Sequence, residues 1–266
     1  MSITVRRTAL AVTALALAAG LTACSSSSGT PSASSSASGG GKLSGTVTVF
    51  AAASLKESFT ELGKKFETAY PGVSVKFNFG GSSALAQSIV SGAPADVFAA
   101  ASPATMKTVT DAKAAADSKV FVRNTLTIAV PKGNPRHIAA LKDLAGAGLK
   151  VALCAKEVPC GAAAVTALKA GEVNLTPVTL EQDVKGALTK VELGEVDASL
   201  VYRTDVIADA AKIDGVDFPE AAKAVNDYPI AALTKAPNAD GAAAFAAYIQ
   251  SADARRVLTA AGFQAP

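Results

Sequence analysis

The chain has 266 residues, of which 50% are hydrophobic, and 25 Lys and Arg against 22 Asp and Glu give a formal net charge of +3. So small an excess of positive charge gives no electrostatic reason to expect nucleic acid binding. The single histidine, His137, follows a loop-like Gly-Asn-Pro-Arg segment, and the sequence has no nucleophile elbow, zinc-protease histidine pair or phosphate-binding loop. The sequence therefore favours a protein that is not an enzyme.

The first residues predict an exported lipoprotein. Arg6 and Arg7 precede an apolar stretch from Ala9 to Ala19, which is too short to span a membrane and is typical of a secretory signal. Cys24 directly follows Leu-Thr-Ala, an order that resembles the bacterial lipobox, in which the cysteine is lipidated. An ordinary signal peptide followed by an incidental cysteine is the alternative. We predict a signal peptide over residues 1–23 and an extracytoplasmic protein anchored to the cell membrane through Cys24.

A low-complexity segment follows the predicted lipidation site. Ser25 to Lys42 is built almost wholly of Ser, Gly, Ala, Thr and Pro. Such a segment lacks the apolar side chains that offset the entropy of ordering, so residues 24–42 are predicted to form the lipidated cysteine and a flexible tether.

From Leu43 onward, strand-like and helix-like patterns alternate. The first part reads as a βαβαβ unit, in which the three strands are expected over Val47–Ala52, Val73–Phe79 and Asp96–Ala100. Ser54 precedes the first helix and Glu57 follows three residues later, which is a capping-box signature. This order predicts a mostly parallel sheet flanked by helices.

A second alternation of strands and helices follows, and two α/β lobes fit this length better than one sheet. We expect lobe 1 to comprise residues 43–124 plus 228–266, including two C-terminal helices, and lobe 2 to comprise residues 125–227. The fold class is therefore α/β with two lobes.

Cys154 and Cys160 lie six residues apart around a Val-Pro step. In an oxidising compartment this pair favours a disulfide that closes a small loop. Two free thiols or a metal site are the alternatives, and a metal site would need further ligands that are absent nearby.

Three junctions between a strand and a helix consist of small or hydroxyl residues. In open α/β sheets, ligands bind beyond the carboxyl ends of the strands, where helix N-termini offer unpaired backbone N–H groups. Several such ends converging would form an anion site without Lys or Arg. For any single serine, helix capping alone is the alternative. The junctions are Phe50–Leu55, Phe79–Leu85 and Val158–Gly161.

The run Val47–Leu55 resembles the opening of the molybdate-binding periplasmic proteins, the substrate-binding subunits of molybdate ABC transporters. Further segments are similar to this family in the same order and cover essentially the whole body after the tether. With its leader, the chain resembles the lipoprotein form found in actinobacteria. The segments are Gly81–Gln87, Gly92–Phe98, Val158–Gly161, Asp183–Leu188, Val201–Tyr202, Tyr228–Ile230 and Ala261–Phe263.

The resemblance implies a two-lobed, type II periplasmic-binding-protein fold that closes over a tetrahedral oxyanion. Matched motif by motif, the ligand would accept hydrogen bonds from the hydroxyls of Ser54, Ser82 and Tyr202. Backbone N–H groups of Cys160 and Val184 would complete the set, with Ser83 as a secondary contact. The family often has a small residue such as Ala at Cys160, and a backbone contact there would be compatible with a disulfide.

The implied ligand is molybdate or tungstate, held through its oxygens with no direct protein ligand to the metal and with no cofactor. The implied partner is the membrane permease of an ABC importer, and the implied state is a monomer. A pocket made only of donors would reject protonated phosphate, whose proton would lack an acceptor, whereas unprotonated sulfate would have to be rejected by size. A receptor for another tetrahedral oxyanion, such as sulfate, on the same fold is the alternative.

Overall fold

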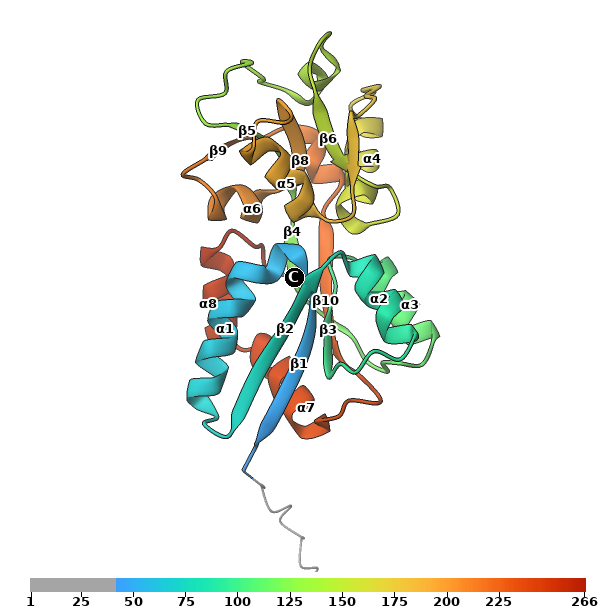
Figure 1. Cartoon of the computed structure of the whole chain (residues 1–266), viewed down its shortest axis with the longest axis vertical. Helices are drawn as coiled ribbons and strands as arrows, with labels where there is room; N and C mark the ends of the chain where they lie inside the picture. The colour runs from blue at the N-terminus through green and yellow to red at the C-terminus, as the bar shows by residue number, and fades with distance from the viewer. Residues whose placement is uncertain (1–41) are drawn as a thin grey trace, which may run out of the picture. The chain divides into compact units, whose positions relative to one another are not determined.

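The structure, a computed structural model, describes residues 42–266, which carry two five-stranded sheets flanked by helices (Figure 1). The predicted signal peptide, Cys24 and all but the last residue of the predicted tether lie outside the described residues. Across residues 42–266, no helix combines the length and the apolar character that a membrane crossing requires.

The first sheet has the strand order β2-β1-β3-β10-β4. Strands β2, β1 and β3 run parallel, whereas β10 runs antiparallel to both of its neighbours. We call this sheet and its helices lobe 1. Its strands are β1 Gly45–Ala52, β2 Val73–Gly80, β3 Val97–Ala99, β4 Lys119–Asn124 and β10 Asn226–Ala232, and its helices are α1 Lys56–Ala69, α2 Ser82–Val90, α3 Pro103–Asp111, α7 Ala239–Ile249 and α8 Ala252–Ala260.

The second sheet has the strand order β7-β6-β8-β5-β9. Here β7, β6 and β8 run parallel, and β5 runs antiparallel to β8 and β9. We call this sheet and its helices lobe 2. Its strands are β5 Leu126–Pro131, β6 Val151–Cys154, β7 Thr179–Glu181, β8 Ala198–Tyr202 and β9 Ile213–Val216, and its helices are α4 Pro159–Ala170, α5 Val184–Glu192 and α6 Arg203–Ala208, with 3₁₀ turns at Leu141–Ala145 and Pro219–Lys223.

Each sheet is therefore mixed, with one reversed strand between otherwise parallel ones. The chain leaves lobe 1 where β4 ends at Asn124 and returns where β10 begins at Asn226, and these two residues are partners in the antiparallel ladder. The two crossings therefore lie side by side (Figure 1). The predicted class, an α/β fold with two sheets flanked by helices, is confirmed.

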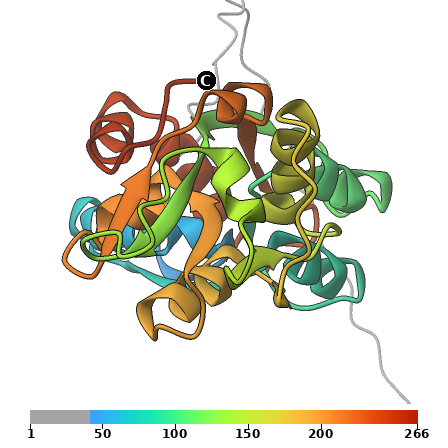
Figure 2. The same ribbon diagram turned by 90° about the horizontal axis from the view of Figure 1, so that it is seen from above.

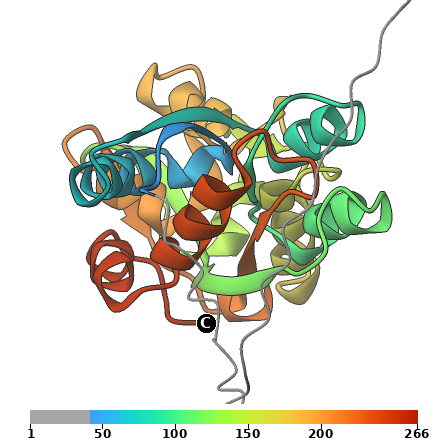
Figure 3. The ribbon, with the colours of Figure 1, turned by 90° about the horizontal axis from the view of Figure 1, so that it is seen from below.

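Helices pack on both faces of the first sheet because both faces carry apolar side chains. On one face, Phe59 and Phe66 of α1 pack edge-on against Phe245 of α7. On the other face, α2 and α3 bury side chains such as Ile89 and Val109. The two groups of helices are visible on either side of lobe 1 from below (Figure 3), and the same body is seen from above in Figure 2.

The predicted capping box at the first helix is wrong. Ser54 lies inside a 3₁₀ turn, Ala53–Leu55, and α1 begins at Lys56 without a side-chain cap. The Ser54 hydroxyl instead lies 2.8 Å from the hydroxyl of Tyr228 on β10. A long-range contact has thus replaced the local one.

Candidate functional site

A small cavity lies between the lobes, beyond the carboxyl ends of strands β1, β2 and β8 and at the starts of helices α2, α4 and α5. Its volume is ≈ 20 Å³, counted as the space open to the centre of a water-sized sphere. A single water needs about 10–15 Å³ on this scale, so the cavity suits one compact group. The lining residues are Ala52, Ala53, Ser54, Gly80, Gly81, Ser82, Ala101, Val158, Pro159, Cys160, Gln182, Asp183, Val184 and Tyr202.

The structure brings together the five residues that the sequence predicts as ligand contacts. Ser54 and Ser82 come from lobe 1, and Cys160, Val184 and Tyr202 come from lobe 2. Each of the five is at most 4% exposed. A ligand in the cavity would therefore be shielded from solvent and would touch both lobes.

Three helices begin at the cavity. Helix α2 starts at Ser82, α4 at Pro159 and α5 at Val184. The first turn of a helix has unpaired N–H groups and carries the positive end of the helix dipole. In α4 the first residue is proline, so the first N–H group of the helix belongs to Cys160.

The serine hydroxyls are arranged to donate into the cavity. The Ser82 Oγ accepts a hydrogen bond of 3.0 Å from the Ala101 N–H group, which leaves the Ser82 proton free. Where the Tyr228 hydroxyl donates to Ser54, the Ser54 proton is likewise free for a ligand.

Tyr202 presents a buried hydroxyl that has no hydrogen-bond partner among the described residues. Burial raises the pKa of this phenol well above its ordinary value, so it remains a protonated donor. An unpaired buried hydroxyl costs about 1–3 kcal/mol, and a ligand oxygen in the cavity would remove that cost. Its ring packs edge-on against Tyr228, with centroids 5.9 Å apart.

The donors of the cavity are neutral. Among the residues that line it, none is Lys, Arg or His, and the one carboxylate, Asp183, accepts a hydrogen bond from the Gly186 N–H group as the N-cap of α5. Nor does the described part of the chain hold a cluster of three or more His, Cys, Asp or Glu side chains suited to a metal ion. The arrangement therefore fits an acceptor-rich anion better than a bare cation.

Cys154 and Cys160 form a disulfide, with Cα atoms 5.7 Å apart. The bond joins the end of β6 to the second residue of α4 and so fixes the start of that helix. It also occupies the Cys160 side chain, which leaves the backbone N–H group as the donor that Cys160 can offer. A side chain at Gly161 would clash with the Ala155 carbonyl, since a Cβ there would lie 1.9 Å from its oxygen.

Ser83 does not line the cavity. Its hydroxyl donates to the Glu157 carbonyl at 2.8 Å and so bridges lobe 1 to lobe 2. Next to it, Gly81 approaches lobe 2 so closely that a Cβ would lie 2.3 Å from the Gln182 carbonyl oxygen. These contacts describe two lobes in close apposition around the cavity.

A larger hollow of ≈ 900 Å³ lies between α1, α6 and α8 and shares Ser54 with the small cavity. Its lining includes Glu57, Glu61 and Asp253 besides Lys65 and Arg256. An anion there would face several carboxylates, so we take the small cavity as the candidate site.

Tyr228 is the residue of this region that the sequence does not mark as functional. It lies within a segment that resembles the family, but its hydroxyl gains a role only through Ser54, which is 174 residues away in the chain. No local signal could have paired the two.

Comparison with known proteins shows the family of the chain. Residues 47–264 match the family described as bacterial extracellular solute-binding protein. The molybdate-binding protein ModA of Mycobacterium tuberculosis (strain ATCC 25618 / H37Rv) is 42% identical over 251 residues, which cover 94% of this chain and 95% of that protein.

Solved structures show the same fold. The periplasmic molybdate-binding protein of Azotobacter vinelandii aligns with a TM-score of 0.71 at 21% identity, covering 83% of this chain and 99% of that one. The sulfate-binding protein SubI of Mycobacterium tuberculosis H37Rv has the same TM-score at 18% identity, covering 83% of this chain and 86% of its own. The chain belongs to the bacterial extracellular solute-binding proteins, in the group that includes the molybdate-binding protein ModA.

Proposed function

We propose that this protein captures molybdate, or tungstate, outside the cytoplasm and delivers it to an ABC importer. The observation that carries the proposal is the convergence of three hydroxyls and the N-termini of α4 and α5 on a cavity of ≈ 20 Å³ without a cation in its lining. The 42% identity to a molybdate-binding protein supports the choice of ligand.

The chemistry of the donors explains the selectivity that we expect. Molybdate and tungstate carry no proton near neutral pH, so each oxygen accepts hydrogen bonds from the serines, Tyr202 and the backbone. Phosphate usually carries a proton at that pH, and this proton would meet a donor. The mismatch would cost about 1–3 kcal/mol, which is about tenfold to a hundredfold in affinity.

Binding would work by closure of the two lobes. Ser54 and Ser82 belong to lobe 1, whereas Cys160, Val184 and Tyr202 belong to lobe 2. A ligand that contacts both sets favours the closed arrangement over an open one, because only the closed arrangement makes all the contacts.

The remaining parts of the proposal concern the setting. The protein would be a monomer attached to the membrane by a lipid on Cys24, would act without a cofactor, and would hand its ligand to a membrane permease rather than transform it. The family, described as extracellular and solute-binding, supports the location and the binding role within this setting.

Sulfate is the second candidate ligand, because a sulfate-binding protein shares the fold with a TM-score of 0.71. Sulfate is also unprotonated at neutral pH, so hydrogen-bond donors alone do not distinguish it. The distinction would rest on the size of the closed cavity.

Isothermal titration of the full chain in mild detergent with molybdate, tungstate, sulfate and phosphate tests the proposal. We expect one-to-one binding of molybdate and tungstate, with sulfate and phosphate much weaker. The Ser82→Ala variant should bind about tenfold to a hundredfold more weakly. Ser88→Ala is the matched control, because Ser88 lies on the same helix with its exposed hydroxyl bonded to the Ala84 carbonyl. Binding of sulfate alone would replace molybdate with sulfate as the ligand. No binding of any of the four ions would refute the proposal that the protein is an oxyanion receptor.

A further inference from the structure

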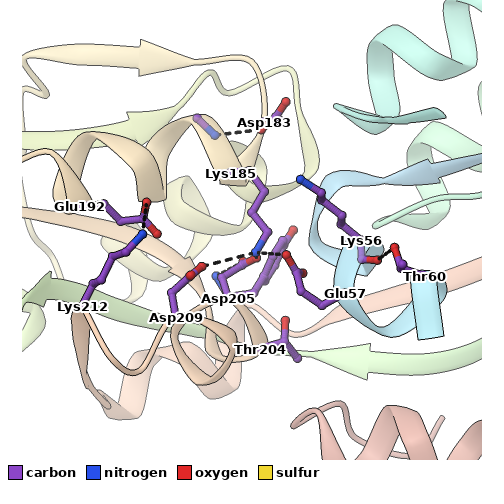
Figure 4. Close-up of polar contacts among 12 residues, drawn as sticks. Lys56, Glu57, Thr60, Asp183, Lys185, Glu192, Thr204, Asp205, Asp209 and Lys212 are labelled. Carbon is purple, nitrogen blue, oxygen red and sulfur yellow. Dashed lines mark hydrogen bonds and ion pairs between the residues drawn. The ribbon is translucent and has the colours of Figure 1, made fainter. Parts of the chain in front are cut away.

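A cluster of charged side chains bridges the two lobes (Figure 4). The Lys185 ammonium on α5 lies 3.1 Å from the Glu57 carboxylate on α1 and 3.2 Å from the Asp205 carboxylate on α6. A third carboxylate, Asp209, lies 3.9 Å away. Glu57 belongs to lobe 1, and the other members belong to lobe 2.

Lys185, Glu57 and Asp205 each lie within three residues of a candidate ligand contact in the chain. Lys185 directly follows Val184, and Glu57 lies three residues after Ser54. Asp205 lies three residues after Tyr202 and accepts a hydrogen bond of 3.2 Å from the Tyr202 N–H group. The cluster thus lies close in the chain to contacts on both sides of the cavity without lining it.

Two members of the cluster, Lys185 and Asp205, are largely buried, which strengthens the dependence of each charge on the other. The Asp205 side chain is fully buried and that of Lys185 is 21% exposed. Burial raises the pKa of Asp205 to about 6, against the lowering influence of Lys185. Burial lowers the pKa of Lys185, but the carboxylates of Asp205 and Glu57 raise it by more, so it stands above its ordinary value. Both groups are therefore charged at neutral pH, and the buried carboxylate depends on the lysine.

We propose that Lys185 is a positioning residue for ligand binding and that its ion pair with Glu57 holds the lobes together in the closed state. The inference rests on the proposed function, because it concerns closure over the ligand. Within lobe 2, Lys185 aligns the N-termini of α5 and α6 through Asp205. Across the lobes, it attaches this pair of helices to α1.

Mutations can distinguish the contact between the lobes, Lys185 with Glu57, from the contacts within lobe 2. If the lobes part, Lys185 keeps Asp205 and Asp209, which move with it, and loses Glu57. Removing the Glu57 charge therefore weakens only the closed state. Removing the Lys185 charge also leaves the buried Asp205 carboxylate with the Tyr202 N–H hydrogen bond but without its counter-charge, which destabilises the protein in either state.

Glu57→Gln in the full chain is the direct test, with Glu61→Gln as the matched control one turn along α1. Glu61 pairs at 3.5 Å with Lys65 of the same helix and makes no ion pair across the lobes. We expect Glu57→Gln to weaken oxyanion binding about threefold to tenfold, the range for a half-exposed ion pair in a network. The loss should appear as faster dissociation in stopped-flow displacement, with the melting temperature of the ligand-free protein unchanged. Glu61→Gln should bind as the wild type does.

A double-mutant cycle with Lys185 separates positioning from simple stability. Lys185→Met should lower both affinity and melting temperature, whereas Lys185→Arg, which retains the charge, should restore most of the affinity. Adding Glu57→Gln to Lys185→Met should cause little further loss of affinity, because the partner of Glu57 is already absent. Equal losses from Glu57→Gln in both backgrounds would overturn the proposal.

The wild-type titration in the same series keeps the two proposals apart. If the wild type binds molybdate and Glu57→Gln binds equally well, the inference fails and the proposed function stands. If the wild type binds only sulfate, the proposed ligand fails, and the same variants titrated with sulfate decide the inference. If the wild type binds none of the ions, both proposals fail.

Discussion

Tyr228 is fully buried on β10, where its hydroxyl lies 2.8 Å from the Ser54 Oγ. Burial raises the pKa of this phenol, so it keeps its proton at neutral pH. Where the tyrosine donates to Ser54, the serine proton is free to point toward the cavity. In that arrangement the tyrosine would act on a ligand through the serine.

Replacement of Tyr228 by Phe should weaken oxyanion binding about tenfold, because one buried hydrogen bond is lost and the Ser54 proton is no longer oriented. Titration calorimetry of the variant measures the change. Tyr248→Phe is the control, since Tyr248 lies on α7 and lines the larger hollow instead. An affinity equal to that of the wild type would show that Ser54 is oriented without Tyr228.

Some site residues could be predicted from the sequence and others could not. The difference depends on whether the evidence for a residue lies near it in the chain. Ser54, Ser82 and Cys160 lie in junctions that a change from strand to helix pattern marks locally, whereas Val184 is assigned through the resemblance to a family. Tyr202 could be predicted only through the resemblance to a family, because nothing near it in the chain indicates a buried, unpaired hydroxyl. Tyr228 depends on a contact across 174 residues.

At the scale of elements, the junction between β2 and α2 limits how closely the lobes approach. Gly81 is the N-cap of α2, and a Cβ at this position would lie 2.3 Å from the Gln182 carbonyl oxygen in lobe 2. The backbone dihedral angles of Gly81, φ −61° and ψ 125°, are ones that any residue adopts. The glycine is therefore required by the approach of the other lobe, not by the conformation of its own backbone.

Gly81→Ala should consequently impair closure while leaving each lobe intact. We expect affinity for the oxyanion to fall by at least about tenfold, since a displacement that relieves this clash would also lengthen several buried hydrogen bonds. The melting temperature of the ligand-free protein should stay within a few degrees of the wild type. A variant that closes normally, as judged by unchanged affinity and unchanged small-angle scattering with ligand, would contradict this account.

Periodicity predicts the first βαβαβ unit and most of the later elements, but it misses α3, β4, β7 and β9 and does not give the direction of every strand. Strands β5 and β10 have apolar patterns like those of their neighbours, yet they run antiparallel to them. Direction is set by where the chain crosses between the lobes, which is a property of tertiary packing. The capping box failed for a related reason, because the Ser54 hydroxyl found a partner in tertiary structure.

At the scale of the whole molecule, the buried Asp205 makes stability depend on pH. Its pKa is about 6 in the folded protein, above the ordinary value of 3.8. As the pH rises from about 4 to about 6, the unfolded chain releases this proton first, so the unfolded state is favoured. The contribution of Asp205 to stability is therefore largest in acid and is lost as the pH approaches its folded pKa.

Urea unfolding of the wild type and of Asp205→Asn at several pH values tests this sign. The unfolding free energy of the wild type, relative to that of the variant, should fall by up to about 3 kcal/mol between about pH 4 and pH 6. Hydrogen bonds that lower the pKa values of Asp143 and Asp214 give the opposite trend, but they are present in both proteins and cancel. A difference that is constant across this range would refute the assignment.

The near-complete burial of the five candidate contacts has a kinetic consequence. We expect an ion held among side chains that are at most 4% exposed to leave for solvent only when the lobes separate. Each departure must therefore wait for an opening of the whole molecule, whichever ion is bound. The rate of that opening limits the rate at which one molecule releases ions, unless a partner protein separates the lobes.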